Sequence, residues 1–240
     1  MSNGIKTSSE GGWERMKKIL AALGGIIAAI DSFAAIPGFG LNYGKNTLYV
    51  YEEFNCNPRI KNDQFFLSYF EYGITDWQSV TLQNISYADG SYYDLSVGIM
   101  QQLCIHDNFN LRGGASYVFG PGQNGYEDGM YYCAFANGKI YGRFGYIFQL
   151  GVMHTFDYKP LWGDAVYLTY DIIDERFTVY ASMTSDFVNF EKSVDFSLGC
   201  WCILLQNKYG FKWISWYFDV GNVIERQEDV RISMGIDLLW

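Results

Sequence analysis

The chain ends on the stretch Val230-Arg-Ile-Ser-Met-Gly-Ile-Asp-Leu-Leu-Trp240, in which an apolar residue stands at every second position. The positions between those apolar residues are mostly polar or small and include Arg231, Ser233, Gly235 and Asp237. Successive side chains of a β-strand point to opposite faces, so this stretch predicts a strand with one apolar and one polar face. Such a strand fits the edge of a soluble β-sandwich, or the wall of a barrel whose outside is apolar.

The same stretch carries a short motif that distinguishes the two cases. The pattern Ser233-x-Gly235-x-x-Leu238-x-Trp240 resembles the C-terminal signal of bacterial outer-membrane β-barrel proteins. That resemblance implies that the barrel assembly machinery recognises Ser233, Gly235, Leu238 and Trp240. It also implies that the protein lies in the lipid bilayer of the outer membrane.

The composition is that of a β protein rich in aromatic residues. Among 240 residues there are 20 Tyr, 18 Phe, 7 Trp and 26 Gly, and charged residues make up 18%. A transmembrane barrel, with apolar residues outside and polar residues inside, has this composition, and so has a soluble all-β domain. The net charge of −9 argues against a nucleic acid as partner, because binding phosphates needs a basic surface.

The N-terminal part has the features of a secretory signal peptide. Met16-Lys17-Lys18 precedes an apolar run from position 19 to 30, which is followed by the small residues Ser32 and Ala34. This order of basic, apolar and small residues predicts cleavage after Ala34, with Met16 as the initiator. The apolar run is too short to span a bilayer as a helix, although it could form a buried N-terminal helix. We therefore expect residues 1–34 to be an extension plus signal peptide, and residues 35–240 to form the barrel.

Alternating apolar runs divide the remaining chain into candidate strands. Their ranges are 46–54, 64–72, 77–87, 92–104, 109–119, 130–136, 139–150, 164–173, 176–184, 193–205, 209–219 and 229–240. Connections after every second strand are short, including a predicted two-residue turn at Asn137-Gly138, and the others are mostly longer. Short periplasmic turns that alternate with long external loops are typical of outer-membrane barrels.

These patterns predict an all-β fold, a closed antiparallel transmembrane β-barrel of twelve strands. Ten strands is the alternative, because the run at 46–54 is weak and the run at 130–136 is short. The sheet must close on itself because hydrocarbon offers no partner for a backbone N–H or C=O group. We expect interfacial aromatic residues near strand ends at Tyr93, Trp213, Tyr217 and Trp240.

The polar faces of the strands predict what lines the interior. We expect pore-lining side chains at Arg112, Arg143, Arg176, Arg231, Asp94, Asp171, Asp195, Asp237, Tyr141, Tyr167 and Tyr180, and further inward aromatic residues at Tyr49, Tyr51 and Trp216. A lining with both charge signs and many aromatic rings suits small polar solutes. Alternatively, the opposite charges pair and fill the lumen, which would leave a structural or adhesive barrel.

A second resemblance concerns the early strands. Asn62-Asp63, an aromatic-rich strand, Asp76-Trp77 and Tyr87-Ala88-Asp89 are similar to the early region of the nucleoside-specific channel-forming (Tsx-like) porin family. The resemblance covers about thirty residues, short motifs that support the architecture more than the substrate. It implies a monomeric, narrow passive channel for small polar solutes, including nucleoside-like ones, that needs no cofactor.

An enzymatic alternative rests on His154. With Asp157 and Asp164 nearby in a predicted external loop at 151–163, it could serve an outer-membrane hydrolase as a base. No Gly-x-Ser-x-Gly nucleophile motif accompanies it, and we expect no metal site. The five cysteines leave at least one unpaired, and we expect Cys200 and Cys202 to be small lipid-facing residues.

Overall fold

The computed structural model describes nine segments of the chain. They are residues 43–58, 64–87, 92–106, 109–119, 128–155, 161–173, 176–186, 195–221 and 230–240. The expected signal peptide at 1–34 and the residue Asp157 lie outside the described residues. Within these nine segments no helix is long and apolar enough to cross a membrane.

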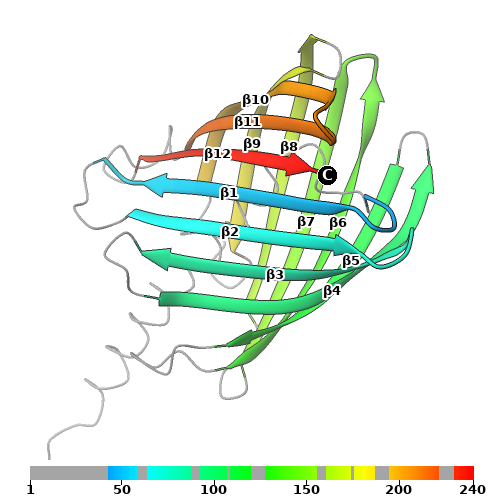
Figure 1. The fold of residues 1–240 in the computed structure, drawn as a ribbon. Helices are drawn as coiled ribbons and strands as arrows, with labels where there is room; N and C mark the ends of the chain where they lie inside the picture. The colour runs from blue at the N-terminus through cyan, green and yellow to red at the C-terminus, as the bar shows by residue number, and fades with distance from the viewer. Residues whose placement is uncertain are drawn as a thin grey trace, which may run out of the picture.

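Twelve antiparallel strands form one closed barrel, as the sequence predicted. Each strand pairs with its neighbours in sequence, and β12 pairs with β1 to close the sheet, as Figure 1 shows for the red and blue strands. The strands are β1 (Leu48–Cys56), β2 (Gln64–Gly73), β3 (Gln78–Tyr87), β4 (Tyr92–His106), β5 (Phe109–Phe119), β6 (Gly129–Tyr141), β7 (Phe144–Thr155), β8 (Leu161–Ile173), β9 (Phe177–Asp186), β10 (Asp195–Lys208), β11 (Phe211–Gly221) and β12 (Arg231–Leu239).

The C-terminal stretch forms the strand that its alternation predicts. In β12, Ser233 and Asp237 are buried in the interior, while Met234 and Ile236 are exposed on the outside. The last residue completes the closure, since the backbone N–H groups of Leu48 and Trp240 each donate to the other residue's carbonyl at 2.9 Å. The seam between the first and last strands is therefore hydrogen-bonded as far as the end of the chain.

Short and long connections between the strands alternate along the chain, as predicted. Short connections at 74–77, 142–143 and 209–210 lie at the end where the chain terminates, which we call the short-turn end, and few residues separate β4 from β5 and β8 from β9. Longer ones, at the long-loop end, follow β1, β5, β9 and β11. One turn was predicted wrongly: Asn137-Gly138 lies inside β6, and the chain turns at Gly142-Arg143. Gly142 has a φ of 56°, a left-handed conformation that glycine adopts without strain.

The outer face of the barrel is largely apolar. Large apolar side chains that project outward and are exposed include Ile99, Leu103, Leu168, Leu198, Met234 and Ile236. The burial of β11 reverses the predictions for three aromatic residues. Tyr217 and Trp213, expected at the interface, lie on the inward face, where Tyr217 is buried and Trp213 packs against Tyr43, and Trp216 takes the outward position. Apart from Ser215, residues 213 to 218 are apolar or aromatic on both faces, so their alternation only weakly shows which face is inside.

Candidate functional site in the barrel interior

The interior of the barrel is lined by polar and aromatic side chains. Buried polar residues there include Glu53, Glu71, Gln102, Arg112, Gln149 and Asp237. Burying an ionised group is unfavourable unless it is paired and hydrogen-bonded, so the partners of these groups define what the interior can do.

A buried ion pair joins β5 to β2. The guanidinium of Arg112 contacts the carboxylate of Glu71 in a buried ion pair and donates to the hydroxyl of Ser79 at 3.0 Å. Glu71 also accepts hydrogen bonds from Ser79 at 2.5 Å and from Tyr69 at 2.8 Å. Arg112 thus reaches past β4 and β3, and the pair braces one side of the barrel from within.

Two further carboxylates are held by neutral donors. Asp237 accepts from the hydroxyl of Ser215, which in turn accepts from the indole N–H of Trp201 at 2.9 Å. Glu53 accepts from the hydroxyl of Tyr51 and from the amide of Asn55. These networks fill the interior around β1, β11 and β12.

Aromatic rings pack between these polar groups. Tyr43 stacks on Tyr49 with ring centroids 4.6 Å apart, and Tyr51 stacks on Tyr217 at 5.6 Å. The ring of Tyr217 also covers Gly235 on the neighbouring strand, where a Cβ atom would overlap it. This half of the interior is therefore filled by side chains and leaves little room for a solute.

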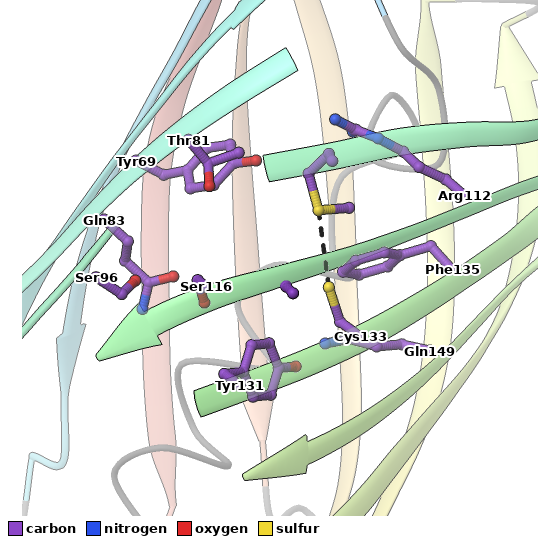
Figure 2. Close-up of a pocket in the computed structure, with 12 residues that line it drawn as sticks. Tyr69, Thr81, Gln83, Ser96, Arg112, Ser116, Tyr131, Cys133, Phe135 and Gln149 are labelled. Atoms are coloured by element: carbon purple, nitrogen blue, oxygen red, sulfur yellow. Dashed lines mark hydrogen bonds between the residues drawn. The ribbon is translucent and has the colours of Figure 1, made fainter. Parts of the chain in front are cut away.

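The opposite half is less filled. A recess there is lined by residues of β2 to β7, mostly with hydroxyl, amide or aromatic side chains: Tyr69, Thr81, Gln83, Ser96, Met100, Arg112, Ala115, Ser116, Tyr131, Cys133, Phe135 and Gln149. Figure 2 shows the labelled side chains around this common space. Thr81, Gln83, Ser116 and Tyr131 are only half-buried, so water reaches this part of the wall.

Gln149 is the most buried of the polar lining residues. Its amide lies close to the Tyr131 hydroxyl, but within the described part of the chain neither the amide oxygen and nitrogen nor that hydroxyl makes a hydrogen bond of regular geometry. Buried polar groups are normally satisfied by protein, water or ligand. The recess therefore presents hydrogen-bonding capacity that the described protein groups do not use.

The residues expected to line the pore lie in different places. Arg112, Asp237, Tyr167 and Tyr180 are buried in the interior. Asp171, Asp195 and Arg231 occupy half-buried positions, and Asp171 accepts a hydrogen bond from Thr178 at 2.6 Å. Asp94 lies in β4 opposite Ile85 in the backbone register.

Three of the expected lining residues lie elsewhere. Tyr141 ends β6 and is 83% exposed, and Arg143 and Arg176 lie exposed in the short connections that follow β6 and β8. The guanidinium of Arg143 donates to the carbonyl of Ile172 at 2.9 Å across that end of the barrel. Alternation along the sequence predicts which face a side chain takes, but it does not show where a strand ends. These three residues were therefore expected in the lumen, whereas they lie at or beyond the ends of their strands.

The residues of the C-terminal motif divide between the two faces. Ser233 is buried and donates to the amide oxygen of Asn55, while Gly235 lies under the Tyr217 ring. Leu238 is half-buried at an outward position, and the Trp240 side chain is exposed. Two of the four motif residues thus have packing roles inside the barrel.

The structure separates the residues of the enzymatic alternative. His154 lies in β7 and not in a loop, four residues along the strand from Leu150, which pairs with Asp164. At about 3.4 Å per residue this places the two roughly 13 Å apart along the strands, beyond hydrogen-bond reach. Among the described residues there is no group of three His, Cys, Asp or Glu side chains that could hold a metal ion.

The cysteines form no disulfide. All five are free thiols and half-buried, and Cys200 and Cys202 occupy the outward positions of β10. Cys133 lies in the recess, with its sulfur 3.7 Å from that of Met100.

Sequence reasoning missed the acidic partners inside the barrel. Glu53 and Glu71 lie in β1 and β2, where the runs Tyr49–Phe54 and Phe65–Tyr72 carry aromatic residues on both faces. The alternation that revealed Arg112 in β5 is therefore weak in these two strands. The sequence held one clue to Glu71. It lies an even number of residues from Leu67 and Tyr69, and therefore on the same face of the strand.

Comparisons with known proteins identify solved structures with a similar fold. No protein-family model matches the chain, and no curated protein matches it. The KdgM porin in complex with disordered oligogalacturonate is similar, with a TM-score of 0.56 at 9% identity over 80% of this chain and 98% of that one. The fold is that of an outer-membrane β-barrel.

Two other solved structures show the same likeness. An outer membrane channel from Pseudomonas putida F1 matches with a TM-score of 0.56 at 10% identity, over 85% of this chain and 99% of that one. The Acinetobacter baumannii outer membrane protein Omp33 matches with a TM-score of 0.51 at 11% identity, over 83% and 100%. At these identities the likeness shows the fold alone.

Proposed function

We propose that this chain is an integral outer-membrane protein that acts as a narrow passive channel for small polar solutes. The observation that carries the proposal is the partly open half of the interior, where the wall of β3 to β6 bears half-buried hydroxyl and amide groups. The apolar outer face and the barrel's likeness to outer-membrane channels support a position in that membrane.

The geometry supports passive diffusion through a passage along β3 to β6. A solute that enters a narrow pore loses part of its hydration, and wall groups such as Thr81, Gln83 and Ser116 can replace those hydrogen bonds. The Glu71–Arg112 pair at the edge of the recess, together with the side chains packed around β1, β11 and β12, narrows the passage and excludes large solutes. Such a channel needs no cofactor and no energy source, because flux follows the concentration gradient.

Nucleoside-like solutes are the finer part of the proposal. The rings of Tyr69 and Phe135 and the hydroxyl groups of the recess suit a solute with a flat ring and several hydroxyls. The resemblance of the early strands to the Tsx-like family, which bears mainly on the architecture, is what first suggests this solute class. That the similarly folded KdgM porin was solved with oligogalacturonate supports a hydroxyl-rich cargo in general.

The proposed route to the membrane uses both ends of the chain. Residues 1–34 direct export and are removed after Ala34, and the barrel assembly machinery recognises Ser233, Gly235, Leu238 and Trp240. The apolar outward positions of β12 then face lipid, as its alternation supports.

A swelling assay tests the proposed channel. Vesicles that contain the refolded protein are expected to swell in isotonic uridine or arabinose at a rate proportional to the protein content. Vesicles with the same amount of unfolded protein serve as the control. Swelling no faster than in this control, for a barrel that shows the heat-dependent gel shift of a folded one, would contradict the channel function.

A structural or adhesive barrel with a filled lumen is the second candidate. The specific observation in its favour is the packing of the interior, where Glu71, Arg112 and Asp237 are buried and hydrogen-bonded. If these networks extend across the passage in the membrane, the protein will fold without conducting. The swelling assay separates the two candidates directly.

A further inference from the structure

Two sulfur atoms meet inside the barrel above a glycine. In the strand register Met100 of β4 pairs with Gly114 of β5, which pairs with Cys133 of β6. A Cβ atom on Gly114 would overlap the Met100 sulfur, so that sulfur lies directly over the glycine. There it contacts the Cys133 sulfur at 3.7 Å, the contact drawn as a dashed line in Figure 2. The absence of a side chain at Gly114 thus lets residues two strands apart bring their sulfurs together.

This sulfur pair lies on the wall of the recess. Met100 and Cys133 both line it, and Cys133 is half-buried. Water reaches the same wall at the half-buried residues Thr81 and Ser116. A thiol packed on a thioether is in many proteins only an apolar contact. Here the contact lies where a dissolved ion can reach it.

A buried amide without a regular hydrogen bond stands beside the pair. Gln149 of β7 pairs with Phe135, which makes it a diagonal neighbour of Cys133 on the inner face, within reach of a long side chain. Gln149 is inaccessible to solvent, and among the described residues its amide makes no hydrogen bond of regular geometry. Buried polar groups are normally satisfied by protein, water or ligand. The amide therefore points independently to an occupant of the recess.

The spacing of the two sulfurs fits a metal ion held between them. Two metal–sulfur bonds of about 2.3 Å whose sulfurs are 3.7 Å apart meet at the metal at about 107°, close to a tetrahedral angle. Thiolate and thioether are soft ligands, and together they select soft ions such as Cu(I). The sulfur pair thus supplies two ligands and leaves further positions of the ion open to the recess.

The charges around the recess favour a monovalent ion. When a metal–sulfur bond forms, the Cys133 thiol releases its proton to water, so the thiolate and a monovalent ion together add no net charge. A divalent ion would add a positive charge beside Arg112, whose own charge is balanced by Glu71. An uncompensated charge in a buried site is unfavourable.

We propose that Met100 and Cys133 form a binding site for a soft monovalent metal ion, Cu(I) or Ag(I), in the wall of the recess. The thiolate and the thioether are two of its ligands, and the Gln149 amide oxygen takes an open position, directly or through a water molecule. This site departs from the sequence-based expectation of no metal site, which considered cysteine and histidine patterns and no thioether ligand. The proposal does not depend on conduction, because binding is measured on the folded barrel.

Silver binding to a chain with one thiol tests the site. The full chain with Cys56→Ala, Cys104→Ala, Cys200→Ala and Cys202→Ala retains Cys133 and is expected to bind one Ag(I) per barrel in equilibrium dialysis. Met100→Leu in this chain conserves volume but removes the thioether, and should weaken the affinity for Ag(I) at least tenfold. Met234→Leu removes a thioether from the outer face of β12 and, as the matched control, should leave the affinity unchanged.

A glycine variant tests the geometry while both sulfurs are kept. Gly114→Ala forces the Met100 sulfur away and should weaken the affinity for Ag(I) about as much as Met100→Leu does. Gly113→Ala is its control, because a Cβ atom there meets only ordinary contacts. A gel that shows the heat shift in each variant establishes that the barrels have folded. If Gly114→Ala does not fold, Met100→Leu decides alone.

X-ray absorption of the Cu(I) form identifies the ligands. Under anaerobic conditions the chain with Cys133 as its one thiol is expected to show two sulfur neighbours of copper at about 2.3 Å, and Met100→Leu one.

Three results would overturn the proposal. The first is a folded barrel with Cys133 that binds no Ag(I). The second is an affinity that Met100→Leu leaves unchanged, and the third is a copper spectrum with one sulfur neighbour before that change. The swelling assay on the metal-free protein is read separately, so failure of the metal site and failure of the channel are distinguished.

Discussion

Glu71 and Arg112 illustrate how one buried pair controls the interior at the scale of single residues. Both side chains are almost fully inaccessible to solvent, and the carboxylate accepts from three donors. Removing one partner leaves the other charge buried without compensation. Replacing both by apolar residues of similar volume removes the charges together, which is often close to neutral.

We therefore expect Glu71→Gln to lower the free energy of unfolding by about 3–5 kcal/mol. The double variant Glu71→Leu with Arg112→Met should recover most of that loss. Urea unfolding followed by tryptophan fluorescence measures both, with Arg176→Met in an exposed connection as the control. Equal stability of Glu71→Gln and the unchanged protein would show that the pair is not a buried brace.

The glycines beneath tyrosine rings are a second residue-scale feature. Tyr180 of β9 lies over Gly199 of β10, and Tyr217 of β11 lies over Gly235 of β12, directly across the strand pairs. A methyl group at either glycine would overlap the ring and force it to move. These rings fill space that a side chain on the next strand would otherwise take.

Gly199→Ala should lower the free energy of unfolding by about 1–3 kcal/mol, the usual cost of overpacking. Gly113→Ala is the matched control, because a Cβ atom there would lie 3.4 Å from its nearest neighbour, an ordinary contact. Urea titration of both variants checks this. The packing account is wrong if the two alanine variants unfold at the same urea concentration.

At the scale of the strand, β4 shows the two faces of the barrel wall. Ile99 is its central outward residue and is 63% exposed, while its neighbour Met100 is buried inside. If this face contacts hydrocarbon, Ile99→Lys should lower the free energy of unfolding in vesicles by about 2–4 kcal/mol. The control is Tyr209→Lys, an even more exposed position in a short connection, which should change the free energy of unfolding little. A similar effect of the two changes would argue against a lipid-facing β4.

Much of the strand pattern could be predicted from sequence, and the exceptions have physical reasons. Strands β5, β9, β10 and β12 alternate regularly between apolar and polar residues, so the sequence predicted correctly which of their side chains face the interior. The turn at Asn137-Gly138 was wrong because a turn signal is local, whereas pairing of Asn137 with Ile147 extends β6 beyond it. Tyr49 and Tyr51 of β1 were correctly expected to point inward. Glu53 and Glu71 were missed because both faces of β1 and β2 carry aromatic residues.

The site was predictable only in part for a related reason. Alternation identified Arg112 and Asp237 as inward residues, but it carries no information on which strands lie opposite each other across the lumen. The pairing of Arg112 with Glu71 spans 41 residues of sequence and arises only when the barrel closes. Nothing in the sequence shows that the amide of Gln149 lies in a recess.

At the scale of the whole molecule, export makes a prediction about the mature chain. Protein isolated from outer membranes should begin at Ala35, as intact mass and N-terminal sequencing would show, because cleavage follows the small residues Ser32 and Ala34. A variant with Ser32→Lys and Ala34→Lys should retain the leader. A membrane-embedded barrel that still begins at Met1 or Met16 would contradict the proposed processing.

The central claim is that the closed barrel conducts, and single-channel recording tests it most directly. The refolded protein, inserted into a planar bilayer, should give discrete current steps that are smaller than those of wide general porins, because side chains fill half of its interior. A folded barrel that inserts but gives no steps would contradict the channel and favour the barrel with a filled lumen.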